Sequence, residues 1–279
     1  MIARLQLDGL DLTVDLTRPV SLAIKLRLDG RSPQFFGAPA AQATPLVAGN
    51  FIGRIADGAS CNCHSLLLTP HCNGTHTESA GHLTREALDV CDVAPREPLL
   101  ALVLSVVPVV AEASGESSDP APLPGDHLIT RAALISAWPA SHPTRNSAKA
   151  LVLRTQARSA VAAHDEHGMS TANRDRFPYL SREAAQLLVE RGVEHLVIDQ
   201  PSIDRAADQG RLCAHRIFFG LAPGSHALAE VRRRQCTITE LAQIPPETAY
   251  GWAMMVLALP RIAGDAVPSQ PWLYAPQET

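Results

Sequence analysis

One short polar segment of the chain, residues 69–84 (TPHCNGTHTESAGHLT), concentrates side chains of the kinds that bind metal ions. It places His71, His76, Glu78 and His82 within twelve residues, among small, hydroxyl-bearing and turn-forming neighbours. Imidazole nitrogens and carboxylate oxygens are suitable ligands for zinc, manganese or iron. The residue types and their spacing therefore favour a metal centre over the alternative, an ordinary polar loop.

The order of residues within the segment indicates how the ligands could meet. His76 and Glu78 are two positions apart, so in an extended chain both side chains project to the same side. Two glycines in the segment allow tight turns that could bring the other ligands close. Thr75 and Thr77 are expected to hydrogen-bond the ligands from outside the centre.

The surrounding sequence predicts an α/β fold with a mixed sheet. Aliphatic and β-branched runs indicate strands, and they lie at residues 10–28, 63–70, 99–110, 150–155, 195–199 and 252–260. Thr130 and Ser181 are placed to cap helices, and Gly192 is placed to end the second one. The strand, helix, strand order leading into residues 195–199 predicts a parallel βαβ unit.

Composition sets the limits of the functional classes. The chain has 279 residues, 46% hydrophobic and 4% aromatic, with a net charge of −4. Its longest basic tract is Arg232–Arg234, so a nucleic-acid surface is not indicated. No apolar run reaches the roughly 18–20 residues of a membrane span, and the N-terminal residues do not resemble a signal peptide. We therefore expect a cytoplasmic protein with reduced cysteines.

The order of motifs along the chain resembles the metal-dependent cyclase-type hydrolases, which include bacterial kynurenine formamidase (arylformamidase) and isatin hydrolase. Their signature H-x-G-T-H-x-D-x-P-x-H is similar to H-x-x-G-T-H-T-E-x-x-G-H in residues 71–82. Residues 176–204 are similar to the family's strand-helix-strand segment, and residues 212–219 (LCAHRIFF) supply a later histidine. The resemblance covers roughly residues 15–260. It implies one domain over residues 1–279 with the swivelling β/α/β cyclase-like fold, and residues 112–125 read as a mobile loop within it.

The resemblance also implies roles for individual residues. His76, Glu78 and His215 match metal ligands of the family, and the centre would hold one or two ions of Zn²⁺ or Mn²⁺. His82 matches the histidine assigned there as acid/base or second-metal contact. Phe35 and Phe36 are candidate substrate contacts from an early loop, the alternative being that they cover the edge of the core.

The sequence departs from the family pattern at three ligand positions. Counting back from His76, the first histidine of the family falls on Cys72, so either His71 or Cys72 could be the first ligand, and we favour His71. Glu78 stands where the family has aspartate. The family's late glutamate is matched only by Glu240, which could equally be a solvent-facing strand residue.

Two other polar clusters stand out. His164–His167 (HDEH) reads as a solvated loop that could flank a cleft. Asp199, Ser202 and Asp204 follow a strand end, where α/β proteins place ligand sites, although Ser202 and Asp204 are better explained as residues that fix the turn.

These features together predict an amidohydrolase. A metal ion lowers the pKa of bound water from about 15.7 to near 7. A histidine such as His82, with an ordinary pKa of about 6.5, can take and return a proton near neutral pH. The resemblance implies cleavage of a C–N bond in a small amide, formamide or cyclic amide by an arylformamidase-like homodimer or homotetramer. A lactone hydrolase and a non-catalytic small-molecule binding protein remain as alternatives.

Overall fold

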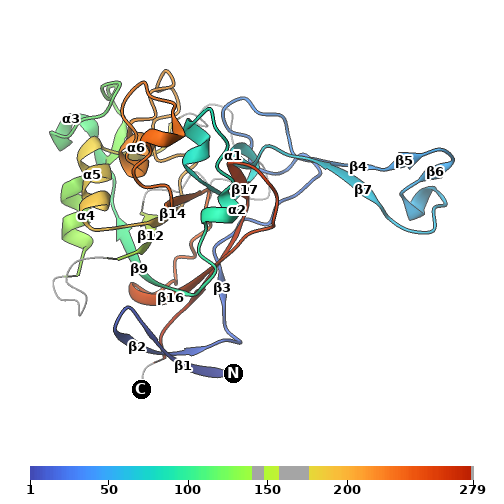
Figure 1. Ribbon diagram of the computed structural model, residues 1–279, viewed down its shortest axis with the longest axis horizontal. Helices are drawn as coiled ribbons and strands as arrows, with labels where there is room; N and C mark the ends of the chain where they lie inside the picture. The colour runs from blue at the N-terminus through green and yellow to red at the C-terminus, as the bar shows by residue number, and fades with distance from the viewer. Residues whose placement is uncertain (140–147, 157–175, 278–279) are drawn as a thin grey trace.

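A computed structural model describes residues 1–139, 148–156 and 176–277 of the chain. A nine-stranded mixed sheet runs through its centre (Figure 1). In order across the sheet, the strands are β17 (Ala266–Pro268), β8 (His76–Glu78), β15 (Thr237–Glu240), β14 (His195–Ile198), β12 (Ala150–Thr155), β9 (Leu99–Val106), β16 (Gly251–Ala258), β18 (Gln270–Tyr274) and β3 (Val20–Ser21). The predicted α/β class with a mixed sheet is confirmed.

The four central strands are parallel, and their directions set the position of the site. β9, β12, β14 and β15 run parallel, whereas β8 and β16 pair antiparallel with the outer two of them. β12 and β14 are adjacent, as the predicted parallel unit requires. Both strands are buried along their full length, which explains why their sequences are continuously apolar rather than alternating.

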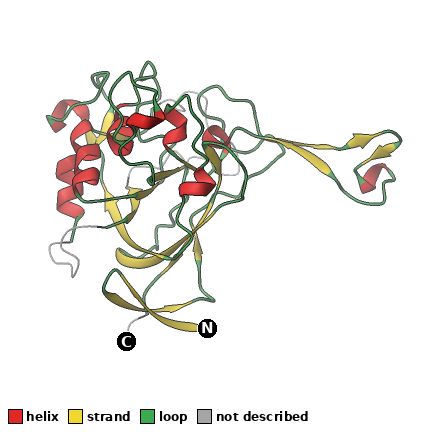
Figure 2. Cartoon of the chain, viewed as in Figure 1, coloured by secondary structure: helices red, strands yellow, loops and turns green. Residues whose placement is uncertain are grey.

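Helices cover one face of this sheet (Figure 2). They are α4 (Arg131–Ala137), α5 (Arg182–Glu190) and α6 (Cys213–Phe219). Alternate residues of β12 face opposite sides: Leu151 and Leu153 pack with these helices, while Val152 belongs to a second apolar cluster on the other face. The expected caps are present, because Thr130 Oγ1 accepts the amide of Ala133 and Ser181 Oγ accepts the amide of Ala184.

Smaller elements surround the sheet. β1 (Ile2–Leu7) and β2 (Leu10–Asp15) form an antiparallel hairpin. A three-stranded sheet is formed by β10 (Val109–Val110), β11 (His127–Ile129) and β13 (Tyr179–Leu180). Short helices α1 (Pro70–Asn73), α2 (Val90–Val93) and α3 (Ala111–Ser114) lie in the connections. None of the helices in the described part of the chain is long and apolar enough to cross a membrane.

An arm made of two small antiparallel sheets projects from the body of the molecule (Figure 1). One sheet pairs β4 (Gln42–Pro45) with β7 (His64–Leu67), and the other pairs β5 (Val47–Ala48) with β6 (Phe51–Ile52). β7 corresponds to the strand predicted from CHSLLLTP, but all four of its residues are exposed, so it does not join the core. An apolar run alone does not reveal whether its strand is buried.

The loop predicted as mobile is hydrogen-bonded to neighbouring helices. Glu116 accepts the backbone amides of Arg131 and Ala132, and Ser117 Oγ donates to Glu183 on α5. These contacts attach the first part of residues 112–125 to the helical layer. The mobility of the loop and the single-domain extent remain predictions.

Candidate metal centre

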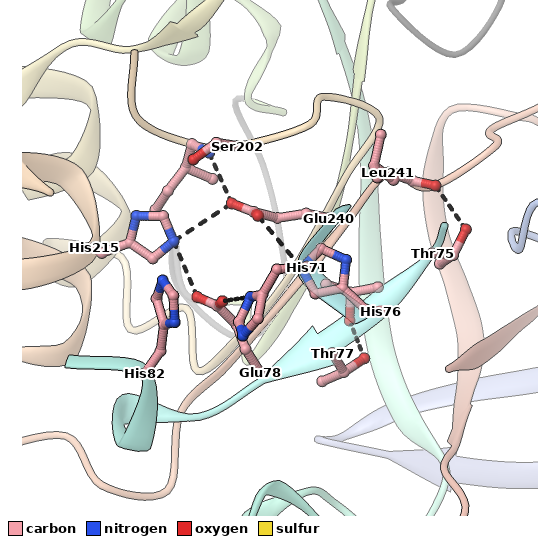
Figure 3. A network of polar contacts seen from close by, with 12 residues as sticks. His71, Thr75, His76, Thr77, Glu78, His82, Ser202, His215, Glu240 and Leu241 are labelled. Atoms are coloured by element: carbon pink, nitrogen blue, oxygen red, sulfur yellow. Dashed lines mark hydrogen bonds and ion pairs between the residues drawn. The ribbon is translucent and has the colours of Figure 1, made fainter. Parts of the chain in front are cut away.

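His76 and Glu78 lie on the same side of β8, as their two-residue spacing predicts (Figure 3). Both side chains are completely buried. Thr77 points the other way and shares a hydrogen bond of 2.7 Å with Thr239 on β15. Thr75 donates to the carbonyl of Leu241. The two threonines therefore hold neighbouring strands together, and the expectation that they hydrogen-bond the ligands is wrong.

His215 reaches the same place from α6. Its Nδ1 donates to Asp204 Oδ2 at 2.7 Å, and its Nε2 lies 2.9 Å from Glu78 Oε1. Asp204 also accepts the backbone amides of Ala214 and His215, so one carboxylate both caps the helix and fixes the imidazole. Ser202 Oγ accepts the amide of Asp204, which agrees with the predicted turn. The link from Asp204 to a ligand was not predicted.

Glu240 completes the buried part of the cluster at the carboxyl end of β15. One of its oxygens accepts the amide of Ile203 at 2.8 Å and lies 3.4 Å from His215 Nε2. The other lies 3.6 Å from His76 Nε2. The side chain is buried, so the alternative of a solvent-facing residue is wrong. β15 runs parallel to β14, and ligand sites lie at this end of parallel strands.

His71, rather than Cys72, faces the cluster from α1. Its Nδ1 lies 3.0 Å from Glu78 Oε2. Successive residues of a helical turn point about 100° apart, so Cys72 cannot share this direction. Cys72 is buried and belongs to none of the groups of possible metal ligands that the described residues form.

A more open end of the cluster carries His82 and a residue that sequence reasoning missed. His82 lies beside Glu78 and His215 and forms a possible three-ligand group with them (Figure 3). Asp265, between β16 and β17, contacts both His71 and His82. The side chains of His71, His82 and Asp265 are 22–42% exposed, whereas the other four are at most 4% exposed. Access to the cluster is therefore from the side of these three residues.

The buried ligand atoms fit a cation. His76 Nδ1 donates to the carbonyl of Gly74, and His215 Nδ1 donates to Asp204, so each Nε2 is left to face the cluster. Four inward-facing atoms lack an aligned hydrogen bond: His76 Nε2, His215 Nε2, Glu78 Oε1 and Glu78 Oε2. Buried polar atoms without partners are costly. A divalent ion would satisfy all four, since imidazole and carboxylate are its normal ligands.

Without a metal, the same groups hold protons and charge. Burial opposes charge on His71, but the nearby carboxylates of Asp265 and Glu78 outweigh it and raise the pKa of His71 to about 10. Burial is likewise outweighed at His215, whose pKa is raised by Glu78 and Asp204. Burial would raise the pKa of Glu78, but the nearby His82 and His215 hold it well below its ordinary value. Protons therefore replace a metal as the balancing positive charge.

These pKa directions predict how the metal-free protein responds to pH. A histidine with a raised folded pKa stabilises the fold below its unfolded pKa of about 6.5, and this contribution is lost as pH rises towards the folded value. We expect the free energy of unfolding of metal-free protein to fall between pH 6.5 and about 10. Urea unfolding at several pH values measures it. A His71→Gln control should show a shallower fall, and a stability that is constant or rising over this range in the original protein would contradict the prediction.

The remaining candidates lie outside the cluster. Phe35 is buried against Leu241, while Phe36 is half-exposed, and both pack edge-on against Phe177. Phe35 thus belongs to the core, and a substrate contact remains a prediction for Phe36. Asp199 accepts hydrogen bonds from Thr155, and burial raises its pKa to about 6. His164–His167 lies outside the described residues.

Comparisons with known proteins identify the family of the chain and its fold. The profile of the family described as "Putative cyclase" matches residues 11–205, more than half of the chain. The search of curated proteins found no match.

Solved structures share the fold at low sequence identity. A predicted metal-dependent hydrolase from Bacillus stearothermophilus is 15% identical, with a TM-score of 0.56 over 92% of this chain and 98% of its own. An isatin hydrolase bound to the product analogue thioisatinate is 16% identical, with a TM-score of 0.59 over 93% of each chain. Isatin hydrolase A from Ralstonia solanacearum is 19% identical, with a TM-score of 0.53 over 92% of this chain and 91% of its own. The mixed sheet is thus a fold that these proteins share.

Proposed function

Because the chain belongs to the cyclase family, we propose that it is a metal-dependent hydrolase that cleaves a C–N bond in a small amide, formamide or cyclic amide. The observation that carries the proposal is the set of four inward-facing ligand atoms of His76, Glu78 and His215 that have no aligned hydrogen-bond partner. They come from separate elements, β8 and α6, and His71 and Glu240 add ligands from two more. Such convergence of buried atoms is expected of a built metal site.

The residues of the chain divide into holding and proton-transfer roles. His71, His76, Glu78, His215 and Glu240 would hold one or two ions of Zn²⁺ or Mn²⁺. When bound, the ion supplies Lewis-acid polarisation and a water molecule of lowered pKa. His82 does not need to serve as a ligand if these five do, so it is available for proton transfer.

His82 is suited to moving the proton at its Nε2. Its Nδ1 contacts Asp265 at 3.3 Å, which leaves Nε2 on the opposite side of the ring. It lies at the more exposed end of the cluster, where a substrate would enter beside the buried ligands. His82 Nε2 would take a proton from the attacking water and return it to the leaving nitrogen. Burial of the four inner side chains keeps bulk water from that end of the site.

The substrate class is proposed on the family and its solved relatives. Isatin hydrolase, to which the fold is similar, acts by its name on isatin. The carbonyl of a cyclic amide or an aryl formamide would approach the cluster from the side of the partly exposed His71, His82 and Asp265. Phe36 is half-exposed and is offered as an aromatic contact for such a ring.

A panel of substrates tests the proposal. Zinc- and manganese-loaded protein would be assayed with N-formylkynurenine, isatin, simple cyclic amides and matched lactones. We expect hydrolysis of at least one amide that is lost on chelation and restored by the metal. Hydrolysis of lactones alone would change the substrate class. A protein that binds the metal but cleaves nothing would support the non-catalytic alternative and contradict the proposal.

A further inference from the structure

Asp265 is the one residue of the polar cluster that neither the motifs nor the ligand pattern indicated. Its Oδ2 lies 2.9 Å from His71 Nε2 and 3.3 Å from His82 Nδ1. It is 194 positions after His71 and precedes β17, which borders β8 in the sheet. The fold, rather than local sequence, therefore brings this carboxylate to both imidazoles.

Backbone hydrogen bonds fix the position of Asp265. Its carbonyl accepts the amide of Ser79 at 2.9 Å, directly after β8. The preceding Gly264 donates to Asp89 Oδ1 and accepts the amide of Val90, each at 2.9 Å. The residue is thus attached to the segment that carries the ligands and to the start of α2. A carboxylate held in this way can orient a neighbouring side chain.

We infer that Asp265 is a positioning residue that holds His71 with its Nε2 protonated, so that Nδ1 is presented to the metal beside Glu78. A carboxylate accepts, so the hydrogen shared with Asp265 sits on Nε2. Nδ1, which lies 3.0 Å from Glu78 Oε2, is then the nitrogen at which a cation beside Glu78 would replace the proton. The inference rests on the proposed metal site. A metal-binding histidine is usually oriented by a hydrogen bond from the ring nitrogen that does not bind the metal to a nearby acceptor.

The other two histidine ligands are held in the same manner. His76 gives its outer hydrogen to the carbonyl of Gly74, and His215 gives its own to Asp204. Those two imidazoles are almost fully buried, so packing also restrains them. His71 is 22% exposed and sits on a single four-residue turn of helix. The orientation of His71 therefore depends more on its hydrogen-bond acceptor, Asp265, than the orientations of His76 and His215 depend on theirs.

The same oxygen also restrains His82. The His71 and His82 rings lie 4.2 Å apart, centroid to centroid, at an angle of 30°. A hydrogen bond from His82 Nδ1 to Asp265 turns the other nitrogen away from the carboxylate. Asp265 consequently links the first metal ligand to the proposed proton-transfer residue.

The experiment compares Asp265→Ala, the isosteric Asp265→Asn and the control Asp92→Asn. Asp92 is an exposed carboxylate on neighbouring α2. Zinc affinity would be measured by chelator competition, and the tautomer of His71 by long-range ¹H–¹⁵N NMR of the zinc-loaded protein. We expect the alanine variant to bind zinc roughly 10–100-fold more weakly, as is typical when a hydrogen-bond partner of a metal ligand is removed. The asparagine variant should be intermediate because its amide oxygen still accepts, and the control should match the original protein.

The outcomes separate this inference from the proposed function. Original protein that binds zinc, together with an Asp265→Ala protein of equal affinity and a His71 still protonated on Nε2, would overturn the role of Asp265 alone. Original protein that binds no metal would overturn both. Weaker binding in both Asp265 variants, with a redistributed His71 tautomer, supports the inference.

Discussion

A Glu78→Gln protein is expected to lose its bound metal and its hydrolytic activity together. Glu78 is fully buried, and its two oxygens face His71 on one side and His215 on the other. The amide keeps the shape of the side chain but removes the negative charge that a divalent ion requires. We expect metal affinity to fall by more than the roughly 10–100-fold that is typical when a residue that only hydrogen-bonds a metal ligand is removed.

The same substitution should also destabilise the metal-free protein. At pH 6 the protonated His71 and His215 would lose their shared counter-charge, and removing one partner from a buried pair typically costs about 3–5 kcal/mol. Metal analysis, activity and urea unfolding measure the three effects. The control is Glu183→Gln on α5, whose carboxylate accepts hydrogen bonds from Ser117 outside the cluster. It should lose some stability and no metal, and a Glu78→Gln protein with full metal content would contradict the prediction.

A His82→Gln protein is expected to keep its metal and lose most of its turnover. General acid–base catalysis by a positioned side chain typically contributes 10²–10⁴-fold, so kcat should fall by roughly this factor. The five proposed ligands remain in this variant, which is why its metal content should not change. The measurements are kcat on the best substrate of the panel and metal content by elemental analysis.

A histidine outside the cluster provides the control for His82. His127→Gln alters an exposed histidine on β11 and should change neither quantity. Loss of metal from His82→Gln in proportion to its loss of activity would show that His82 is a ligand, as its place in a group with Glu78 and His215 also allows. The proton-transfer role would then be wrong.

The part of the site that the sequence predicted well is local in the chain. The two-residue spacing of His76 and Glu78 determines that they share a face of any extended strand. The buried strands and the caps at Thr130 and Ser181 were predictable for the same reason, since apolar patterning and hydroxyl caps act over a few residues. His215 was placed by resemblance, and the structure brings it to Glu78.

What sequence reasoning missed depends on distant pairing. Thr75 and Thr77 were expected near the ligands, but their partners are Leu241 and Thr239 on the neighbouring strand segment. The direction of Glu240 depends on the register between β15 and β8, which no local pattern reveals. Asp265 carries no motif at all, because its contacts arise from a loop placed by the sheet. In each case the deciding interaction spans more than 150 positions in the chain.

The central claim, that these side chains converge on one cation centre, is tested most directly by crystallography of metal-reconstituted protein with data collected at the absorption edge of the metal. The account predicts an anomalous peak among His71, His76, Glu78, His215 and Glu240, at about 2.0–2.2 Å from the His76 and His215 Nε2 atoms and the nearest carboxylate oxygens. Reconstituted crystals with no peak at this place, or with a peak bound only by other residues, would contradict it.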